Sequence, residues 1–265
     1  MSSLTKLTPA ADVPAHQAPG HWVLARLGKR ILRPGGLALT RKMIEALNIG
    51  YSDKVVEFAP GLGMTAKMTL EKKPASYTAI EREPKAAEQV RQYLKGDTQT
   101  CITASVHETG LESLSATVVY GEAMLSMQSD GRKCEIMREA ARLLPIGGQY
   151  AIHELCLTNV TPELQDTIHT ELSRTLHVGA TPITREQWQH RLEQAGFKVK
   201  RVYTAPMALL EPGRILRDEG IRQSIRFFFN LALDPEACTR IFRMRALFQK
   251  YKNHLSAIAI IAEKQ

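Results

Sequence analysis

The sequence predicts a doubly wound α/β fold with a seven-stranded, mostly parallel sheet and helices on both faces. Three observations support this. Short apolar, β-rich runs alternate with helical patterns between residues 54 and 153, a glycine turn follows the first run directly, and residues 256–262 are apolar enough to form a buried strand. Parallel strands need crossover connections, and the alternating helices supply them. The predicted architecture is therefore Rossmann-like.

Each expected strand is a short run of β-branched, aromatic or small apolar residues bounded by turn signals. The first run stops at Pro60-Gly61. The seven expected strands are 54–59, 76–80, 101–104, 116–120, 149–153, 198–204 and 256–262.

The helices expected between these strands carry recognisable start and stop signals. Thr184 is a suitable N-cap for the last of them and Gly196 closes it, while Pro145 punctuates the end of the third. The expected helices are 64–72, 84–94, 131–144, 162–177 and 184–195.

The chain length of 265 residues favours one elaborated domain. Residues 1–20 are expected to be a flexible leader, and residues 21–265 the single domain. Helices interrupted by a Pro-Gly-Gly sequence are expected at 21–50. A helical insertion at 208–255, split at Asp234-Pro235, is expected just before the last strand.

The composition excludes several classes of protein. Apolar residues make up 44% of the chain and charged residues 23%, a balance typical of a globular protein and not of a disordered one. There is no apolar run of about 18 residues, so no transmembrane helix is expected. The four cysteines are far apart and form no disulfide or metal pattern, which suits a reducing cytoplasm.

The net charge of +8 is concentrated in two acid-free basic segments, 22–42 and 240–252. Such an excess attracts phosphates, anionic lipid or acidic small molecules. We interpret both segments as solvated helix faces. No nucleic-acid-binding module or aromatic-interleaved basic motif is present, so a nucleic-acid partner is not expected.

The segment with most information about function is the turn after the first strand. It contains Gly61 and Gly63 and leads into a helix, so backbone N–H groups at the helix start can approach a ligand closely. Glu81 ends the next strand, 20 residues after Gly61. A carboxylate at that position can accept hydrogen bonds from both ribose hydroxyls of an adenosine cofactor.

Two cofactors fit this arrangement. The turn with Gly61, Gly63 and Ala66 is a relaxed dinucleotide fingerprint, which would indicate NAD(P). S-adenosylmethionine also carries adenosine but has no pyrophosphate. It is favoured by Glu57 within the preceding strand, where an acid can bind the ammonium of the cofactor directly or through water.

With these motifs in place, the sequence resembles the class I S-adenosylmethionine-dependent methyltransferases, in particular the ubiquinone and menaquinone biosynthesis group. The resemblance rests on EFAPGLG at 57–63, AIERE at 79–83 and the segment 118–155. The resemblance implies a final hairpin of reversed direction. The chain departs from the family pattern at Ala59, where a glycine is usual, and at Ala104-Ser105, where an acid is usual.

The resemblance also implies a cofactor site. The methionine and ribose end would be lined by the glycine turn, the ribose held by Glu81, the adenine flanked by Arg82, and the methyl region formed by residues after the fourth strand. The implied cofactor-binding residues are Glu57, Ala59, Gly61, Gly63, Glu81, Arg82, Ala104, Ser105, Gly121, Glu122 and Ala123.

The reacting groups are expected at the carboxyl ends of the strands. Methyl transfer from a sulfonium is an in-line displacement for which alignment supplies much of the rate, and some acceptors also need a base. Candidate catalytic residues are Glu122 after the fourth strand, His153 at the end of the fifth, and His177 on a loop. His153 is the favoured base, and no metal site is expected.

The helices of the insertion are expected to pack as a lid or as a homodimer surface. Their basic, amphipathic pattern leaves an anionic membrane surface as the alternative. Arg33, in the N-terminal helical region, is expected to reach the carboxylate of the cofactor.

The function that the sequence predicts is a methyltransferase that uses S-adenosyl-L-methionine and a small-molecule acceptor. The alternatives are an NAD(P)-binding oxidoreductase and a non-catalytic module that binds the same nucleoside.

Overall fold

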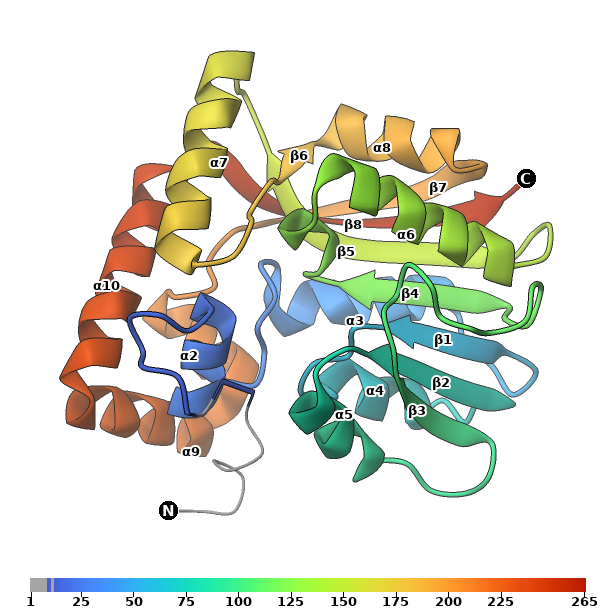
Figure 1. Ribbon diagram of the computed structural model, residues 1–265, viewed down its shortest axis with the longest axis horizontal. Coiled ribbons are helices and arrows are strands. Elements are labelled where there is room, and N and C mark those ends of the chain that lie inside the picture. The colour runs from blue at the N-terminus through green and yellow to red at the C-terminus, as the bar shows by residue number, and fades with distance from the viewer. Residues whose placement is uncertain (1–8, 11) are drawn as a thin grey trace.

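The computed structural model describes residues 9–10 and 12–265 and contains one mixed sheet in that part of the chain (Figure 1). The seven predicted strands are present and lie in the order β3-β2-β1-β4-β5-β8-β7, and a two-residue strand, β6, pairs with β5 as an eighth. The bounds are β1 (Lys54–Phe58), β2 (Ser76–Glu81), β3 (Gln99–Thr103), β4 (Val118–Glu122), β5 (Gln149–Leu157), β6 (Ile183–Thr184), β7 (Phe197–Pro206) and β8 (Leu255–Lys264).

The first five strands run parallel, and β8 is inserted antiparallel between β5 and β7. The reversed final hairpin is therefore present. Its β8 strand is a run of alanine and isoleucine from Ala257 to Ala262 that is at most 2% exposed, so both of its faces are covered. A strand buried on both faces has a continuous apolar sequence, which is why this segment could be recognised.

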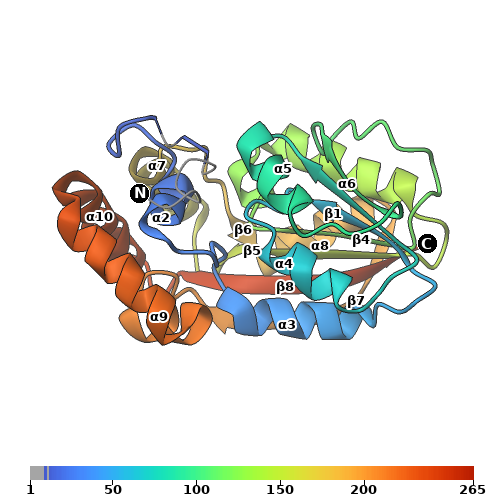
Figure 2. The same ribbon diagram turned by 90° about the horizontal axis from the view of Figure 1, so that it is seen from below.

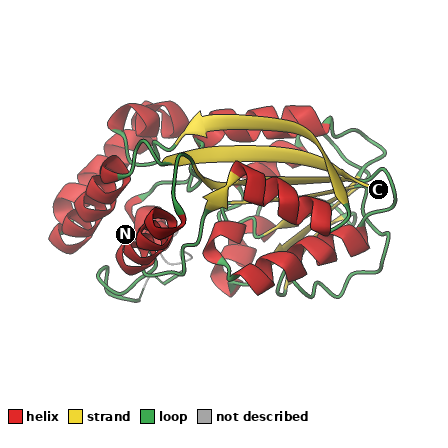
Figure 3. Cartoon of the chain, turned by 90° about the horizontal axis from the view of Figure 1, so that it is seen from above, coloured by secondary structure: helices red, strands yellow, loops and turns green. Residues whose placement is uncertain are grey.

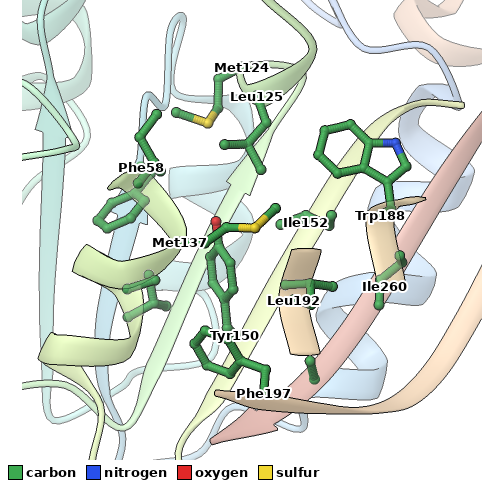
Figure 4. Close-up of a cluster of buried hydrophobic side chains, with 14 of the residues drawn as sticks. Phe58, Met124, Leu125, Met137, Tyr150, Ile152, Trp188, Leu192, Phe197 and Ile260 are labelled. Atoms are coloured by element: carbon green, nitrogen blue, oxygen red, sulfur yellow. The ribbon is translucent and has the colours of Figure 1, made fainter. Parts of the chain in front are cut away.

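Helices cover both faces of the sheet, with α3 (Gly36–Leu47) and α6 (Asp130–Leu143) on opposite sides (Figure 2). On the α3 side, apolar residues of α3, α4 (Met64–Leu70) and α5 (Pro84–Arg91) form one core with the sheet. On the α6 side, α6 and α8 (Arg185–Gln194) form the other. In this core Trp188 is fully buried beside the sheet (Figure 4), and its indole N–H donates to the carbonyl of Leu155 over 3.0 Å.

A third group of helices stands beyond the carboxyl ends of the parallel strands, at one end of the molecule (Figures 1 and 3). It consists of α2 (Gly20–Leu27), α7 (Pro162–Leu176), α9 (Pro212–Leu233) and α10 (Pro235–Lys250), which share their own apolar core. We call this group the cap. It contains the predicted insertion, and α9 is kinked at Gly220, whose φ is 75°.

The predicted leader falls partly on residues 1–8 and 11, which lie outside the described residues. Its described part packs against the cap. Ala15 and Ala18 are buried there, and the Arg240 guanidinium of α10 donates to the carbonyls of both. Among the described helices, none combines the length and the low polarity needed to cross a lipid bilayer.

Candidate functional site

A cavity of about 610 Å³ lies between the carboxyl ends of the strands and the cap. This is within the range of about 300–1,000 Å³ usual for small-molecule sites. β1 and β4 are neighbours in the sheet although β2 and β3 lie between them in sequence, so the crossovers diverge to opposite sides at this position. Ligands of open α/β sheets bind at such a switch point.

The turn after β1 forms the floor of the cavity. Gly61 has a φ of 57° and lines the cavity, and a Cβ added to it would meet no other atom within 4 Å, so that side chain would extend into open space. Gly63 has a φ of 73° and precedes α4, but its Cβ would lie 2.8 Å from Tyr93. Gly61 is therefore open toward a ligand, whereas Gly63 is needed for packing behind the turn. Ala59 also lines the cavity, with a φ of 52°.

Glu81, the last residue of β2, lies directly beside this turn. One carboxylate oxygen accepts the Gly61 N–H over 2.9 Å, and the other accepts the Glu83 N–H over the same distance. Burial raises the pKa of Glu81, although the backbone hydrogen bonds oppose that shift. Each oxygen can accept a second hydrogen bond, and the residue lines the cavity next to Arg82.

Glu57 lines the same cavity from within β1, and its carboxylate is held from behind. Two phenol hydroxyls donate to one of its oxygens, Tyr77 over 2.5 Å and Tyr120 over 2.7 Å. Burial raises the pKa of Glu57 to about 7, despite those hydrogen bonds. This carboxyl group therefore changes its protonation near neutral pH.

Glu122, the last residue of β4, is at the centre of a buried polar network. Its carboxylate pairs with Arg33 over 2.5 Å, accepts hydroxyl hydrogen bonds from Thr40 and Thr65, each over 2.5 Å, and lies 2.8 Å from Nδ1 of His153. Burial opposes its ionisation, but Arg33 and His153 outweigh burial and lower the pKa of Glu122 to about 2. The carboxylate is therefore ionised and has all of its acceptor positions in use.

The two candidate histidines do not line the described cavity. His153 is fully buried behind Glu122, and its Nε2 accepts the Gly35 N–H over 3.2 Å, so both ring nitrogens have protein partners. His177 ends α7 and lies 3.2 Å from a guanidinium nitrogen of Arg240. Glu122 and Arg33 do line the cavity.

The remaining predicted residues divide in the same way. Ser105 and Ala123 line the cavity, whereas Ala104 and Gly121 do not. Ala104 donates its N–H to the carbonyl of Glu81 over 3.2 Å and so joins the two strand ends. A Cβ at Gly121 would lie 3.3 Å from Phe58, so this glycine serves the packing of β4 against β1.

Sequence reasoning expected the insertion helices as a lid or as a homodimer surface, but it did not identify the residues that α2 contributes to the site. His21 and Trp22 of α2 line the cavity, with their ring centroids 4.6 Å apart. Burial and the nearby Arg82 lower the pKa of His21 to about 4, so it is a neutral imidazole at pH 7. Nothing in the local pattern indicated that this face of α2 turns toward the strand ends.

The loop after β4 is held by a buried carboxylate from β5. Glu154 accepts the backbone N–H groups of Met124, Leu125 and Ser126 over 2.9, 2.7 and 3.0 Å. These bonds shape the 3₁₀ turn Leu125–Met127 and the cavity wall beside it. Glu154 is therefore a positioning group for this loop. Among the described residues, no group of three or more His, Cys, Asp or Glu side chains is arranged to hold a metal ion.

Part of the cavity lining is an apolar wall. It combines residues from the β4 and β5 ends, α6 and the segment after β7 with residues of the cap. Its apolar members are Met124, Met127, Ile136, Leu155, Leu176, Val178, Met207, Leu209, Met244 and Phe248.

We compared the chain with known protein families, sequences and structures. No protein-family model matches the chain. A protein of Haemophilus influenzae (strain ATCC 51907 / DSM 11121 / KW20 / Rd) with no characterised function is 27% identical over 249 residues, covering 92% of this chain and 98% of that protein.

Solved structures are similar over most of the chain. A phosphoethanolamine N-methyltransferase 2 of Haemonchus contortus, in complex with phosphomonomethylethanolamine and S-adenosylhomocysteine, matches with a TM-score of 0.70 at 14% identity, over 100% of this chain and 61% of that one. A geranyl diphosphate C-methyltransferase of Streptomyces coelicolor A3(2), in complex with Mg²⁺, geranyl diphosphate and S-adenosyl-L-homocysteine, matches with 0.63 at 12% identity, over 86% and 79%.

The [4+2]-cyclase SpnF matches with a TM-score of 0.69 at 14% identity, over 95% of this chain and 96% of that one. The chain therefore has the class I fold of S-adenosylmethionine-dependent methyltransferases. Because a cyclase shares this fold, the reaction must be argued from the site.

Proposed function

We propose that this protein is an S-adenosylmethionine-dependent methyltransferase that acts on a small-molecule acceptor. The observation that carries the proposal is the pairing of Gly61 with Glu81, with a backbone turn open to the cavity and a carboxylate beside it. A Cβ at Gly61 would enter the space that the nucleoside needs, and this explains the glycine. The fold and its switch point are consistent with this site.

In this proposal, the adenosine lies across the ends of β1, β2 and β3. Glu81 accepts the ribose hydroxyls with the lone pairs that its two backbone contacts leave free. Arg82 and Ser105 flank the adenine, and His21 and Trp22 of α2 cover the opening from the cap. Once bound, the cofactor supplies a methyl group on a positively charged sulfur.

The methionine end lies toward Arg33 and Glu57. Arg33 contacts Glu122, Thr40 and Thr65 through one terminal nitrogen, Nη1, so the planar guanidinium presents further N–H groups to a carboxylate. Glu122 holds Arg33 in place and offsets its buried charge. Glu57 receives the ammonium group, because an ionised carboxylate at the cavity wall favours a cation.

The acceptor lies against the apolar wall formed by the β4 and β5 ends and the cap. That wall, with Met127, Leu155, Met207 and Phe248 among its members, fits a molecule with a substantial apolar surface. An acceptor of the quinone-biosynthesis type belongs to this class, and we propose it as the more specific acceptor class.

Rate acceleration in this site comes mainly from alignment of the acceptor with the methyl group and from exclusion of water. Glu122 is fully hydrogen-bonded and ionised, so we assign it to the positioning of Arg33. His153 reaches Glu122 and not the cavity, so a role as base requires a rearrangement that separates it from Gly35.

Isothermal titration calorimetry with the intact chain tests the proposal. We expect heat of binding with S-adenosylmethionine and S-adenosylhomocysteine and none with NAD(P)H. Glu81→Gln should weaken the affinity by roughly 10–100-fold, because hydrogen bonds to an ionised acceptor contribute about 1.5–3 kcal/mol. Glu88→Gln is the matched control, since Glu88 is exposed on α5 outside the cavity.

No binding of either nucleoside at millimolar concentration would refute the proposal. Release of S-adenosylhomocysteine over a panel of apolar phenols, thiols and amines then separates an enzyme from a binding module. A protein that binds the nucleoside and transforms a substrate without releasing the demethylated product would match the cyclase alternative.

A further inference from the structure

The second half of α9 presents apolar side chains to solvent. Between residues 221 and 233, seven residues are exposed, and all except Arg222 are apolar. We call these six the α9 face; they are Ile221, Ile225, Phe228, Phe229, Ala232 and Leu233. The exposed fractions reach 71% for Ile221 and 68% for Leu233, and on a helical projection with 100° per residue the six lie on one side.

The α9 face points away from the rest of the cap, because the opposite side of α9 packs against the other helices of the cap. Phe227 and Leu231 are buried there. The Gln223 amide donates to the carbonyl of Gly28 over 2.5 Å, and the Asn230 amide donates to the carbonyl of Leu27 over 3.0 Å. Of the three consecutive phenylalanines, the structure buries Phe227 and leaves Phe228 and Phe229 exposed.

The exposed charges beside the face are mainly basic, and Glu236, an exposed acid just after the face, contacts His16. Arg217 and Arg222 are exposed. In contrast, Glu219 is 6% exposed and accepts the N–H groups of Arg30 and Ile31, and Asp234 accepts a backbone N–H at the start of α10. An exposed apolar face with a basic margin results.

These charges discriminate between two occupants. In a two-fold symmetric dimer the same surface lies on both subunits, so basic margins would meet basic margins. An anionic lipid surface complements the margin and also offers an apolar layer for the phenylalanine, isoleucine and leucine side chains. Water-soluble monomers rarely expose a contiguous apolar patch without a partner.

We propose that the α9 face binds an anionic lipid surface, with this half of the helix lying parallel to the membrane plane. The same cap contributes Met244 and Phe248 of α10 to the apolar wall of the cavity. A membrane-bound cap thus places that wall next to the phase in which apolar acceptors partition. The proposal itself is independent of the bound cofactor and of the reaction.

Vesicle flotation with the full chain tests this inference. We expect the protein to float with vesicles made of equal parts phosphatidylglycerol and phosphatidylcholine, less so with pure phosphatidylcholine, and less at high salt. The double variant Ile225→Asp/Phe229→Asp should lower the partition coefficient at least about tenfold. Ile146→Asp is the matched control, because Ile146 is 80% exposed in the turn between α6 and β5, outside the cap.

A second variant keeps the test independent of folding. Arg222→Glu alters one exposed charge and should weaken binding to anionic vesicles about tenfold, with an unchanged thermal transition. Absence of flotation with anionic vesicles, or equal flotation of the double variant and the wild type, would overturn the proposal. So would light scattering that reports a dimer which the double variant converts to a monomer, since a second copy would then cover the face.

Discussion

Replacement of Glu122 by glutamine tests whether the buried pair with Arg33 holds the site together. The pKa of Glu122 is about 2 instead of the ordinary 4.5. By linkage, this difference corresponds to about 3 kcal/mol of folding free energy at neutral pH. Because the folded-state pKa is depressed, this stabilisation is fully present above about pH 4.5 and is lost as the pH falls toward 2.

We expect Glu122→Gln to lower the free energy of unfolding by about 3 kcal/mol at pH 7, since Arg33 is left buried without its counter-ion. The difference between variant and wild type should shrink as the pH falls from about 4.5 toward 2. Urea unfolding at a series of pH values measures both quantities. Glu45→Gln is the control, because Glu45 is exposed on α3, the helix that supplies Thr40.

Two results would contradict this reasoning. One is a variant as stable as the wild type at pH 7, which would mean that the ion pair contributes no more than its desolvation costs. The other is a loss that does not change with pH, which would place the effect in packing and not in ionisation.

Two further predictions concern the cavity wall. Because the folded-state pKa of Glu57 is about 7, the wild type loses stability as the pH rises from 4 to 8, and Glu57→Gln should gain about 3 kcal/mol relative to it over that range. Denaturant unfolding at pH 4 and at pH 8 checks the sign. A difference in unfolding free energy between variant and wild type that is the same at both pH values would refute this reasoning. Gly61→Ala and Gly96→Ala should each cost about 1–2 kcal/mol in melting experiments, since both positions have positive φ and open space. Calorimetry should show that the Gly61 variant alone loses nucleoside affinity, and equal affinities would exclude Gly61 from the site.

The strand–turn–helix elements of the site were predictable because their signals are local. A buried strand has a continuous apolar sequence, and a turn with positive φ favours glycine. Gly61 and Glu81 are 20 residues apart, and the parallel pairing of β1 with β2 brings their sheet ends together. This pairing is the reason that the sequence could predict Gly61 and Glu81 together at the nucleoside end of the cavity.

The buried network required the tertiary structure. Arg33 and Glu122 are 89 residues apart, and neither position has a pattern that indicates the other. His153 was expected at the cavity because it ends the predicted strand 149–153. However, β5 continues to Leu157, so His153 lies within the strand and behind Glu122.

The sequence by itself determined the sheet, the glycine turn after β1 and the helical insertion, because backbone propensity and hydrophobic periodicity act over a few residues. The tertiary structure alone decided that His21 and Trp22 of α2 line the cavity, that Glu122 pairs with Arg33, and that Phe227 is buried while Phe229 is 62% exposed. Burial depends on which distant surface a residue meets, and no local pattern carries that information.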